Sequence, residues 1–199
     1  MNKLLSEIKY QFRYGLPVWF VMLLSAWFPD VGPFMRIRGA LVSIFLPGCP
    51  VGLSLAKDIT LLSINRINIG KNVFIAKGVW INGIGGITID DEVVIAPYVV
   101  MSSNNHGFKD GSVRFGGGHP SPISIGRGTW LAAHAVVAAG VCIGKGNLIA
   151  ANSVVTKDTE NNVVIAGVPA VKIKDRIDNP SRITSKHELE LTPIKKEAE

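Results

Sequence analysis

The chain has 199 residues, enough for one domain with a substantial core and short appendages. Hydrophobic residues make up 47% of it and charged residues 18%, which excludes a disordered chain or a polar fibre. The net charge of +6 suits an anionic ligand or a membrane surface, but it is scattered along the chain, so nucleic acid is not an expected partner. Cys49 and Cys142 have no CxxC spacing and indicate neither a disulfide framework nor a zinc site. A reducing, cytoplasmic compartment is the simplest interpretation.

Residues 1–50 predict an apolar helical arm. Its run "LPVWFVMLLSAWF", residues 16–28, is too short to span a bilayer, which needs about 20 apolar residues. Basic residues Lys3, Lys9 and Arg13 precede the run, as in a signal peptide, but a proline, bulky aromatics and the lack of a small-residue cleavage site argue against one. Two interpretations stay open. The arm lies in a membrane interface, at the inner face of the cytoplasmic membrane, or it packs on the domain or a partner subunit.

Aliphatic residues then return at every sixth position, in two runs. A period of six is a multiple of the strand period of two and not of 3.6, so it predicts short strands separated by turns. A short residue follows each aliphatic and lets the chain turn a corner. The pattern predicts an all-β solenoid over residues 51–174, a coil of parallel strands with the aliphatics inside a narrow prism. These positions are Ile69, Ile75, Ile81, Ile89, Ile95, Met101, Ile125, Leu131, Val137, Ile143, Ile149 and Val155.

The position before each aliphatic must point outward, yet it is also apolar in most repeats. Apolar rows of this size are usually covered by a partner, so we expect a homo-oligomer whose prisms pack side by side with clefts between subunits. The alternative is a solvated face whose residues only favour strands. The positions are Phe74, Trp80, Val94, Val100, Trp130, Val136, Cys142, Leu148 and Val154.

The period slips by two residues at Gly85–Gly86 and is suspended over residues 107–122, "GFKDGSVRFGGGHPSP". This predicts a loop that protrudes from one corner of the solenoid, and long loops on rigid scaffolds are often functional. His106 stands directly before the loop. Residues 161–174 are expected to close the last coil, and the charged, aperiodic residues 175–199 to form a mobile tail.

Three features together resemble a known family: the hexapeptide period, "NNHGF" at the mouth of the loop, and "IGRGTWLAAHAVVAAGVCIGKGNLIAANSVVTKD" followed by "AGVPAVKIK". The chain is similar to the hexapeptide-repeat acyltransferases, closest to the maltose/galactoside O-acetyltransferase branch and its polysaccharide O-acetyltransferase relatives. The likeness covers residues 60–174. It implies a left-handed parallel β-helix, a homotrimer, acetyl-CoA as donor without a metal, and a hydroxyl acceptor.

The resemblance also implies roles for individual residues. His106 matches the catalytic histidine, and Asn82, Asn104 and Asn105 are the expected acceptor-side residues. The family's usual proline after the histidine is Gly107 here. Two positions that contact sugar in the galactoside branch are the apolar Ala76 and Ile84, so the acceptor differs. The acetyl-CoA contacts map onto Trp130, Ala133, Ala151, Thr156, Lys157 and Lys174.

The chemistry expected of such a site is general-base catalysis. An alcohol becomes a good nucleophile when a base removes its proton, and histidine, with a pKa near 6.5, suits that task. An acceptor such as the amide oxygen of Asn104 or Asn105 would fix its tautomer, and backbone N–H groups at coil corners would stabilise the oxyanion. Transfer would be direct in a ternary complex, to a surface polysaccharide or a lipid-linked sugar. The alternatives are a γ-type carbonic anhydrase using His106, His119 and His134, whose spacing fits zinc poorly, and a non-catalytic structural β-helix.

Overall fold

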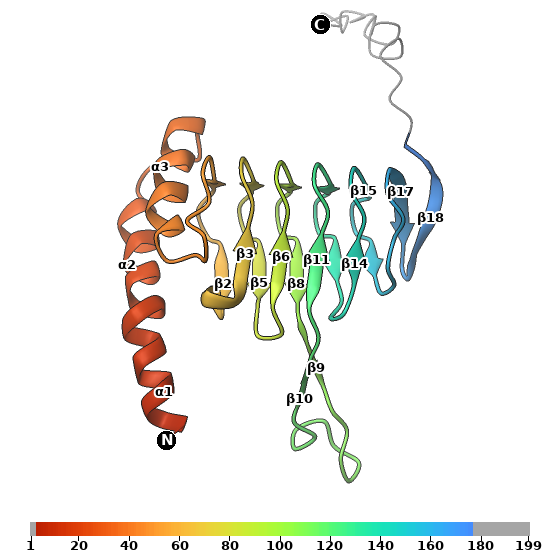
Figure 1. Cartoon of the computed structure of the whole chain (residues 1–199), viewed down its shortest axis with the longest axis horizontal. Coiled ribbons are helices and arrows are strands. Elements are labelled where there is room, and N and C mark those ends of the chain that lie inside the picture. The colour runs from red at the N-terminus through yellow and green to blue at the C-terminus, as the bar shows by residue number, and fades with distance from the viewer. Residues whose placement is uncertain (1–2, 177–199) are drawn as a thin grey trace, which may run out of the picture.

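The computed structural model describes residues 3–176. Helices form a layer at one end of a β-solenoid, a two-stranded hairpin projects from its middle, and an antiparallel strand closes the far end (Figure 1). The solenoid winds as a left-handed parallel β-helix, so the predicted fold class is confirmed. The last coil was expected to end at residue 174, and its last strand ends at Asp175. The rest of the predicted tail, residues 177–199, lies outside the described residues.

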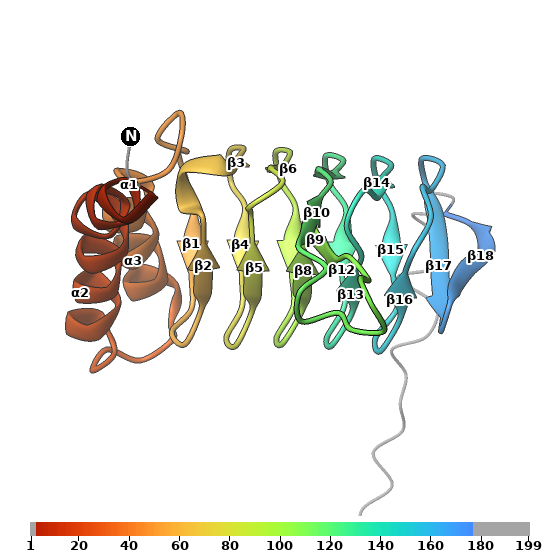
Figure 2. The same ribbon diagram turned by 90° about the horizontal axis from the view of Figure 1, so that it is seen from below.

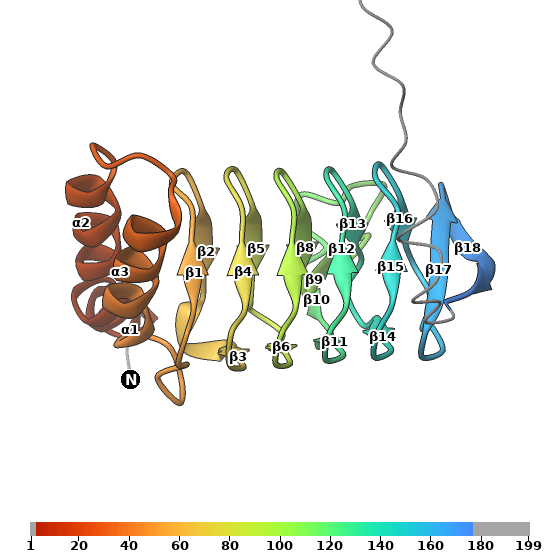
Figure 3. The same ribbon diagram turned by 90° about the horizontal axis from the view of Figure 1, so that it is seen from above.

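We call the helical layer over residues 3–43 the cap. Its outermost helix (Figures 2 and 3) is a continuous run whose middle turn widens to a π-helix just before Pro17. Pro33 stands in the first turn of the last helix, where a missing N–H costs nothing. Gly39 lets the last helix approach the solenoid, because a Cβ there would overlap the carbonyl oxygen of Leu53. The elements are α1 (Lys3–Tyr10), η1 (Gln11–Gly15), α2 (Leu16–Ser25) and α3 (Gly32–Ser43).

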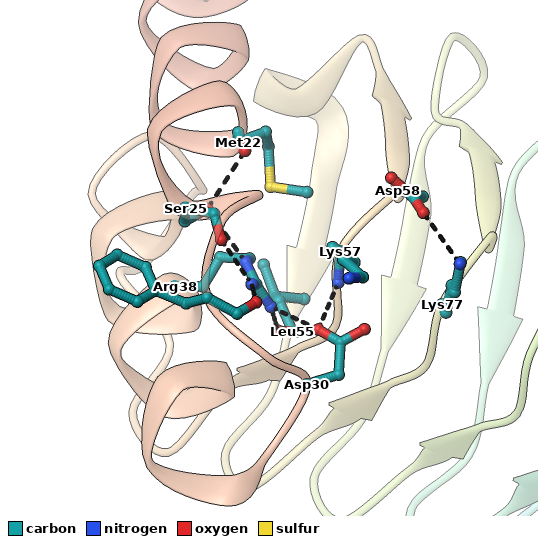
Figure 4. A network of polar contacts seen from close by, with 9 residues as sticks. Met22, Ser25, Asp30, Arg38, Leu55, Lys57, Asp58 and Lys77 are labelled. Carbon is teal, nitrogen blue, oxygen red and sulfur yellow. Dashed lines mark hydrogen bonds and ion pairs between the residues drawn. The ribbon is translucent and has the colours of Figure 1, made fainter.

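A buried arginine fixes the cap to the first coil (Figure 4). The Arg38 side chain is fully buried and pairs with Asp30 at 3.0 Å. It donates to the carbonyl oxygen of Leu55 at 2.8 Å, and to the hydroxyl and carbonyl oxygens of Ser25 at 3.0 and 2.9 Å. A buried charge is tolerated when it is paired and hydrogen-bonded in this way. The network therefore joins α2, α3 and β1 into one unit.

The solenoid has three parallel sheets, which we call A, B and C. Sheet A runs the full length of the molecule, with consecutive coils in register, for example Ile75 beside Ile95. Its last strand turns back antiparallel on the one before and also approaches sheet B. Its strands, in order, are β1 (Ser54–Leu55), β4 (Phe74–Ile75), β7 (Val94–Ile95), β12 (Trp130–Leu131), β15 (Leu148–Ile149), β17 (Val163–Gly167) and β18 (Ala170–Asp175).

Sheets B and C complete the triangular coil. In sheet B the order is β16 (Val154–Val155), β13 (Val136–Val137), β8 (Val100–Ser102), β5 (Trp80–Asn82) and β2 (Thr60–Leu62). In sheet C the order is β14 (Cys142–Ile143), β11 (Ile123–Ile125), β6 (Ile87–Ile89) and β3 (Ile67–Ile69), which follows η2 (Ile64–Arg66).

All twelve aliphatic positions of the six-residue period are buried, none more than 7% exposed, so the predicted core is confirmed. The outward positions differ in polarity from one sheet to another, which the sequence analysis did not predict. Sheets A and B carry the large apolar side chains, such as Trp130 and Trp80. Sheet C presents Asn68, Thr88 and Ser124, with Cys142 the sole outward member of the predicted row there. Two faces of the prism are apolar and one is polar.

Candidate active site

The chain leaves the solenoid after β8 and returns through β11. Between them, β9 (Asn104–His106) pairs with β10 (Gly118–Pro120), with His106 opposite Gly118 and Asn105 opposite His119. The excursion is therefore a hairpin with a loop at its tip, and the strand pairing begins before residue 107. His106 lies inside the hairpin, on its exposed surface, whereas the sequence placed it just outside the loop.

A buried serine anchors the base of the hairpin to the preceding coil. The Ser103 hydroxyl donates to the carbonyl oxygen of Asn82 at 2.8 Å and accepts from the backbone N–H of Gly85 at 2.8 Å. Its carbonyl oxygen accepts from the N–H of Ser121 at 2.9 Å. A Cβ at Gly85 would overlap that carbonyl, which explains why the period slips at a pair of glycines. Ser103 positions the hairpin, and its full burial removes it as an acylation site.

The structure explains why position 107 is glycine, where the family usually has proline. Its N–H donates to the carbonyl oxygen of Gly117 at 2.9 Å, a bond that proline lacks. An added Cβ would overlap the carbonyl oxygen of Gly116 and lie 2.5 Å from Nε2 of His119. The two sides of the hairpin thus approach closely at Gly107, and the imidazole of His119 lies beside the residue that follows His106. This juxtaposition arises from pairing across the hairpin and has no local sequence signal.

Within residues 3–176, neither ring nitrogen of His106 makes a hydrogen bond. The expected contact from the amide oxygen of Asn104 or Asn105 is therefore wrong for the single chain. The Asn104 side chain lies across the hairpin against Gly118 instead, because a Cβ on that glycine would be 2.9 Å from its Oδ1. Asn82 stands beside Ser102 in the β5–β8 pairing, so it lies next to the coil from which the hairpin departs. Its Oδ1 accepts from the N–H of Ile84 at 3.2 Å.

Two of the expected cofactor residues occupy neighbouring corners between sheets A and B. Ala133 lies between β12 and β13, and Ala151 between β15 and β16; the N–H of Asn152 donates to the carbonyl oxygen of Ala133 at 3.0 Å. Small side chains there leave backbone groups accessible along the corner. Trp130, 42% exposed, lies on the outer face of sheet A just before this corner.

The remaining cofactor residues lie elsewhere. Thr156 and Lys157 are exposed and follow β16, at the end of sheet B from which the hairpin also departs. Lys174 lies on β18 opposite Val164. Neither Lys157 nor Lys174 forms an ion pair within the described chain, in contrast to Lys172, whose pKa is raised by hydrogen bonds to Asp175 and Glu160. Both lysines are therefore available to an anionic ligand.

One chain does not bring the whole set together. β13 lies beside β8 in sheet B, so the Ala133 corner is at the start of these strands and the His106 hairpin is at their end. The width of sheet B separates them.

The three histidines of the zinc alternative are also apart. His134 occupies a corner in the left-handed backbone region, with its ring stacked on Tyr98 at a centroid distance of 5.1 Å, whereas His106 and His119 belong to the hairpin. Among the described residues no group of three or more His, Cys, Asp or Glu side chains is placed to hold a metal ion. The structure gives this alternative no support.

In the part of the chain that the structure describes, every helix falls short of the length and apolar character needed to cross a bilayer.

Sequence comparisons find relatives with the same repeat. The family described as bacterial transferase hexapeptide (six repeats) matches residues 122–157. Galactoside O-acetyltransferase of Escherichia coli (strain K12) is 38% identical over 111 residues, 56% of this chain and 55% of that protein, so the match spans about half of that relative's length. A protein of the same organism provisionally named as a colanic acid biosynthesis acetyltransferase, WcaF, is 31% identical over 157 residues, 77% of this chain and 81% of that protein.

Solved structures share the fold. A galactoside acetyltransferase in complex with coenzyme A matches with a TM-score of 0.73 and 29% identity, over 89% of this chain and 85% of that one. A hexapeptide-repeat acetyltransferase of Vibrio cholerae O1 biovar eltor, complexed with acetyl coenzyme A, matches with a TM-score of 0.72 and 23% identity, over 85% and 90% of the two chains.

Proposed function

This chain belongs to the hexapeptide-repeat acetyltransferase family, and on that premise we propose that it moves an acetyl group from acetyl-CoA to a hydroxyl of a saccharide. The observation that carries the proposal is the hairpin: a rigidly anchored excursion from the middle of the β-helix that exposes His106. The relatives' names, galactoside O-acetyltransferase and colanic acid biosynthesis acetyltransferase, support a sugar acceptor.

In the proposed reaction His106 acts as general base. It takes the proton of the acceptor hydroxyl as the oxygen attacks the thioester carbonyl carbon. The oxyanion that forms is stabilised by backbone N–H groups at a coil corner, and the C–S bond then breaks. The departing coenzyme A thiolate receives the proton back from the imidazolium. The products are an acetyl ester and free coenzyme A, and the enzyme is unchanged.

The donor's long pantetheine arm would run along the Ala133–Ala151 corner, where small side chains leave room. Trp130 would pack beside it, and Thr156 would contribute a hydroxyl. Lys157 and Lys174 would pair with phosphates at the nucleotide end, which suits exposed lysines that lack partners in the described chain. Asn82, Asn104 and Asn105 lie at or beside the hairpin and would face the acceptor.

A homotrimer is the assembly that we propose. Sheets A and B offer apolar outer faces and sheet C a polar one, which suits three prisms packed around an axis. Such packing would bring the hairpin of one subunit to the alanine corner of its neighbour and complete the site between chains. The proposed location is the cytoplasm, at the inner face of the membrane, with a surface polysaccharide or lipid-linked sugar as acceptor. Light scattering would measure the mass of the assembly.

The decisive experiment is His106→Asn. We expect turnover, followed as coenzyme A thiol released from acetyl-CoA with a panel of saccharides, to fall about 10²- to 10⁴-fold, because the base is lost. The circular dichroism spectrum and oligomeric mass should not change, since the side chain is exposed. His187→Asn, at a histidine that is not among the proposed site residues, is the matched control and should keep full turnover. Near-normal turnover in His106→Asn would show that another group is the base; acetyl-CoA left unconsumed by the native protein with every acceptor would favour a structural role.

A further inference from the structure

The cap carries an apolar surface that the proposed reaction does not use. Along the outer side of α1, η1 and α2, large exposed side chains recur at spacings of three and four residues, so they share one face of the helix. Trp27 is 90% exposed and Phe12 71% exposed. Contiguous apolar patches of this kind on soluble proteins usually mark a contact with a partner or a membrane. The stripe comprises Leu4, Ile8, Phe12, Leu16, Trp19, Phe20, Leu23, Leu24 and Trp27.

The stripe cannot turn inward, because the opposite face of the helix is already packed. Tyr14, Val18 and Met22 lie against the hydrophobic core of the first coils. The hydroxyl of Tyr10 accepts a hydrogen bond from the N–H of Ile64 at 3.2 Å, and the buried Arg38 network holds the end of α2 (Figure 4). The cap is therefore anchored with its apolar stripe on the outside of the end of the solenoid, where Figures 2 and 3 place α2 farthest from the coils.

The charge of the cap selects the kind of partner. Between residues 3 and 43 there are five basic and two acidic residues. One of the two acidic residues, Asp30, is paired with buried Arg38. Lys9, Arg13 and Arg36 are exposed and basic, against the exposed acidic Glu7, so the exposed surface of the cap carries a net positive charge. A second copy of the cap would bring like charges together, whereas an anionic surface would neutralise them.

We propose that the cap docks on an anionic lipid bilayer with its helices parallel to the surface. Exposed Trp side chains on the outer face of the cap, together with exposed basic residues of the same helical layer, match the composition that binds at a headgroup boundary. The flat orientation follows from geometry, because one face of the arm is committed to the solenoid. The cap would enter the interface to the depth of its apolar side chains and no further. Docking rests on the proposed transferase function, and it would place the enzyme at the surface where a lipid-carried sugar is found.

With the cap docked flat, the hairpin that carries His106 would project from the middle of the solenoid alongside the bilayer, because it extends in the same direction as the helical arm (Figure 1). The N-terminal end of α1 extends beyond the body of the solenoid on the same side as the hairpin that carries His106 (Figure 1). An acceptor whose lipid portion stays in the bilayer would be held near the protein by the same surface that holds the cap. Docking would raise the local concentration of acceptor without any added contact to the sugar.

The test is co-sedimentation of the full chain with vesicles of phosphatidylcholine, with and without phosphatidylglycerol. We expect binding to the anionic vesicles that weakens with salt and is far weaker without phosphatidylglycerol. Trp19→Ser with Leu23→Ser should lower the partition coefficient on the order of tenfold or more, because two apolar side chains no longer enter the interface. Lys9→Gln and Arg13→Gln should each lower it about fivefold, and only on anionic vesicles.

Val168→Ser with Val171→Ser is the matched control. These side chains are 71% and 59% exposed at the opposite end of the solenoid, so the loss of exposed apolar surface there should leave partitioning unchanged. Undiminished binding by the Trp19/Leu23 variant, or an equal loss in the control, would overturn the proposal. Failure of the native protein to bind anionic vesicles would also overturn it. If light scattering then gave a mass larger than one assembly, and the Trp19/Leu23 variant reduced that mass, the stripe would be a protein–protein contact instead. Coenzyme A binding, measured separately by calorimetry, shows whether the transferase proposal survives either result.

Discussion

The solenoid buries its repeated apolar side chains, whereas the cap exposes many of its own. In the solenoid the aliphatic residue of every repeat points inward and is almost fully buried, and packing is shared among identical coils. In the cap one side of the helix packs on the core and the other exposes aromatic residues such as Trp19 and Trp27 to the surroundings. Apolar content alone therefore does not locate a core: the buried aliphatic side chains of the solenoid stabilise the fold, whereas the exposed aromatic side chains of the cap are available to a partner.

The largest effect on stability should come from the interior of the solenoid. Ile95 is fully buried between Ile75 and Leu131 of adjacent coils. Its replacement by Ala should lower the free energy of unfolding by about 4 kcal/mol, because the stacked strands cannot collapse into the cavity. Urea denaturation measures the change. A loss below about 1 kcal/mol would mean that the coils are loosely packed and that the contrast with the cap is false.

A smaller effect should follow from cutting the cap's attachment. Arg38→Leu removes the partner of Asp30 and the guanidinium donors to the carbonyl oxygens of Ser25 and Leu55, so we expect a loss of about 3 kcal/mol. Arg36→Leu is the matched control on the same helix, where the side chain is exposed and the change should stay within about 0.5 kcal/mol. Equal effects in the two variants, again by urea denaturation, would show that the buried network does not hold the cap.

The smallest effect should come from the outer side of the cap. Trp27 is 90% exposed, so Trp27→Ser should change the free energy of unfolding by less than about 0.5 kcal/mol despite the loss of a large aromatic ring. Thermal and urea denaturation without lipid measure this. A loss comparable to that of Ile95→Ala would place the tryptophan in a structural interface of the assembly. The contrast between buried side chains of the solenoid and exposed side chains of the cap would then not hold.

The sequence was sufficient to predict the solenoid because its signal is local and repeated. Each coil restates the same inward position, so the core, the parallel strands and the fold class follow from counting. The resemblance of residues 60–174 added the handedness and the family, which the comparisons confirm. The division into two apolar faces and one polar face was missed, because it emerges only when every third repeat is grouped, as the three sheets require.

The site was less accessible to such reasoning. His106 could be singled out because it precedes the break in the period, but its hairpin depends on pairing between residues twelve or more positions apart. Nothing in the sequence indicates that Ser103 is a buried anchor of the hairpin, because its partners are backbone groups of the preceding coil. Arg38 looked like one of several scattered charges, and its burial depends on carbonyl groups supplied by other segments. The separation of Ala133 from His106 across sheet B likewise emerges only when the coils are stacked.

The two ends of sheet A have a consequence for the behaviour of the protein in a crowded solution. A parallel coil is a template that could add further coils of its own kind at either terminus, as fibre-forming chains do. Here the helix α3 lies against β1, and β18 pairs antiparallel with β17. Each end of sheet A is therefore covered by a segment that does not continue the parallel coil. The repeat can therefore be long and regular without inviting polymerisation, and the number of coils stays the one that the chain encodes.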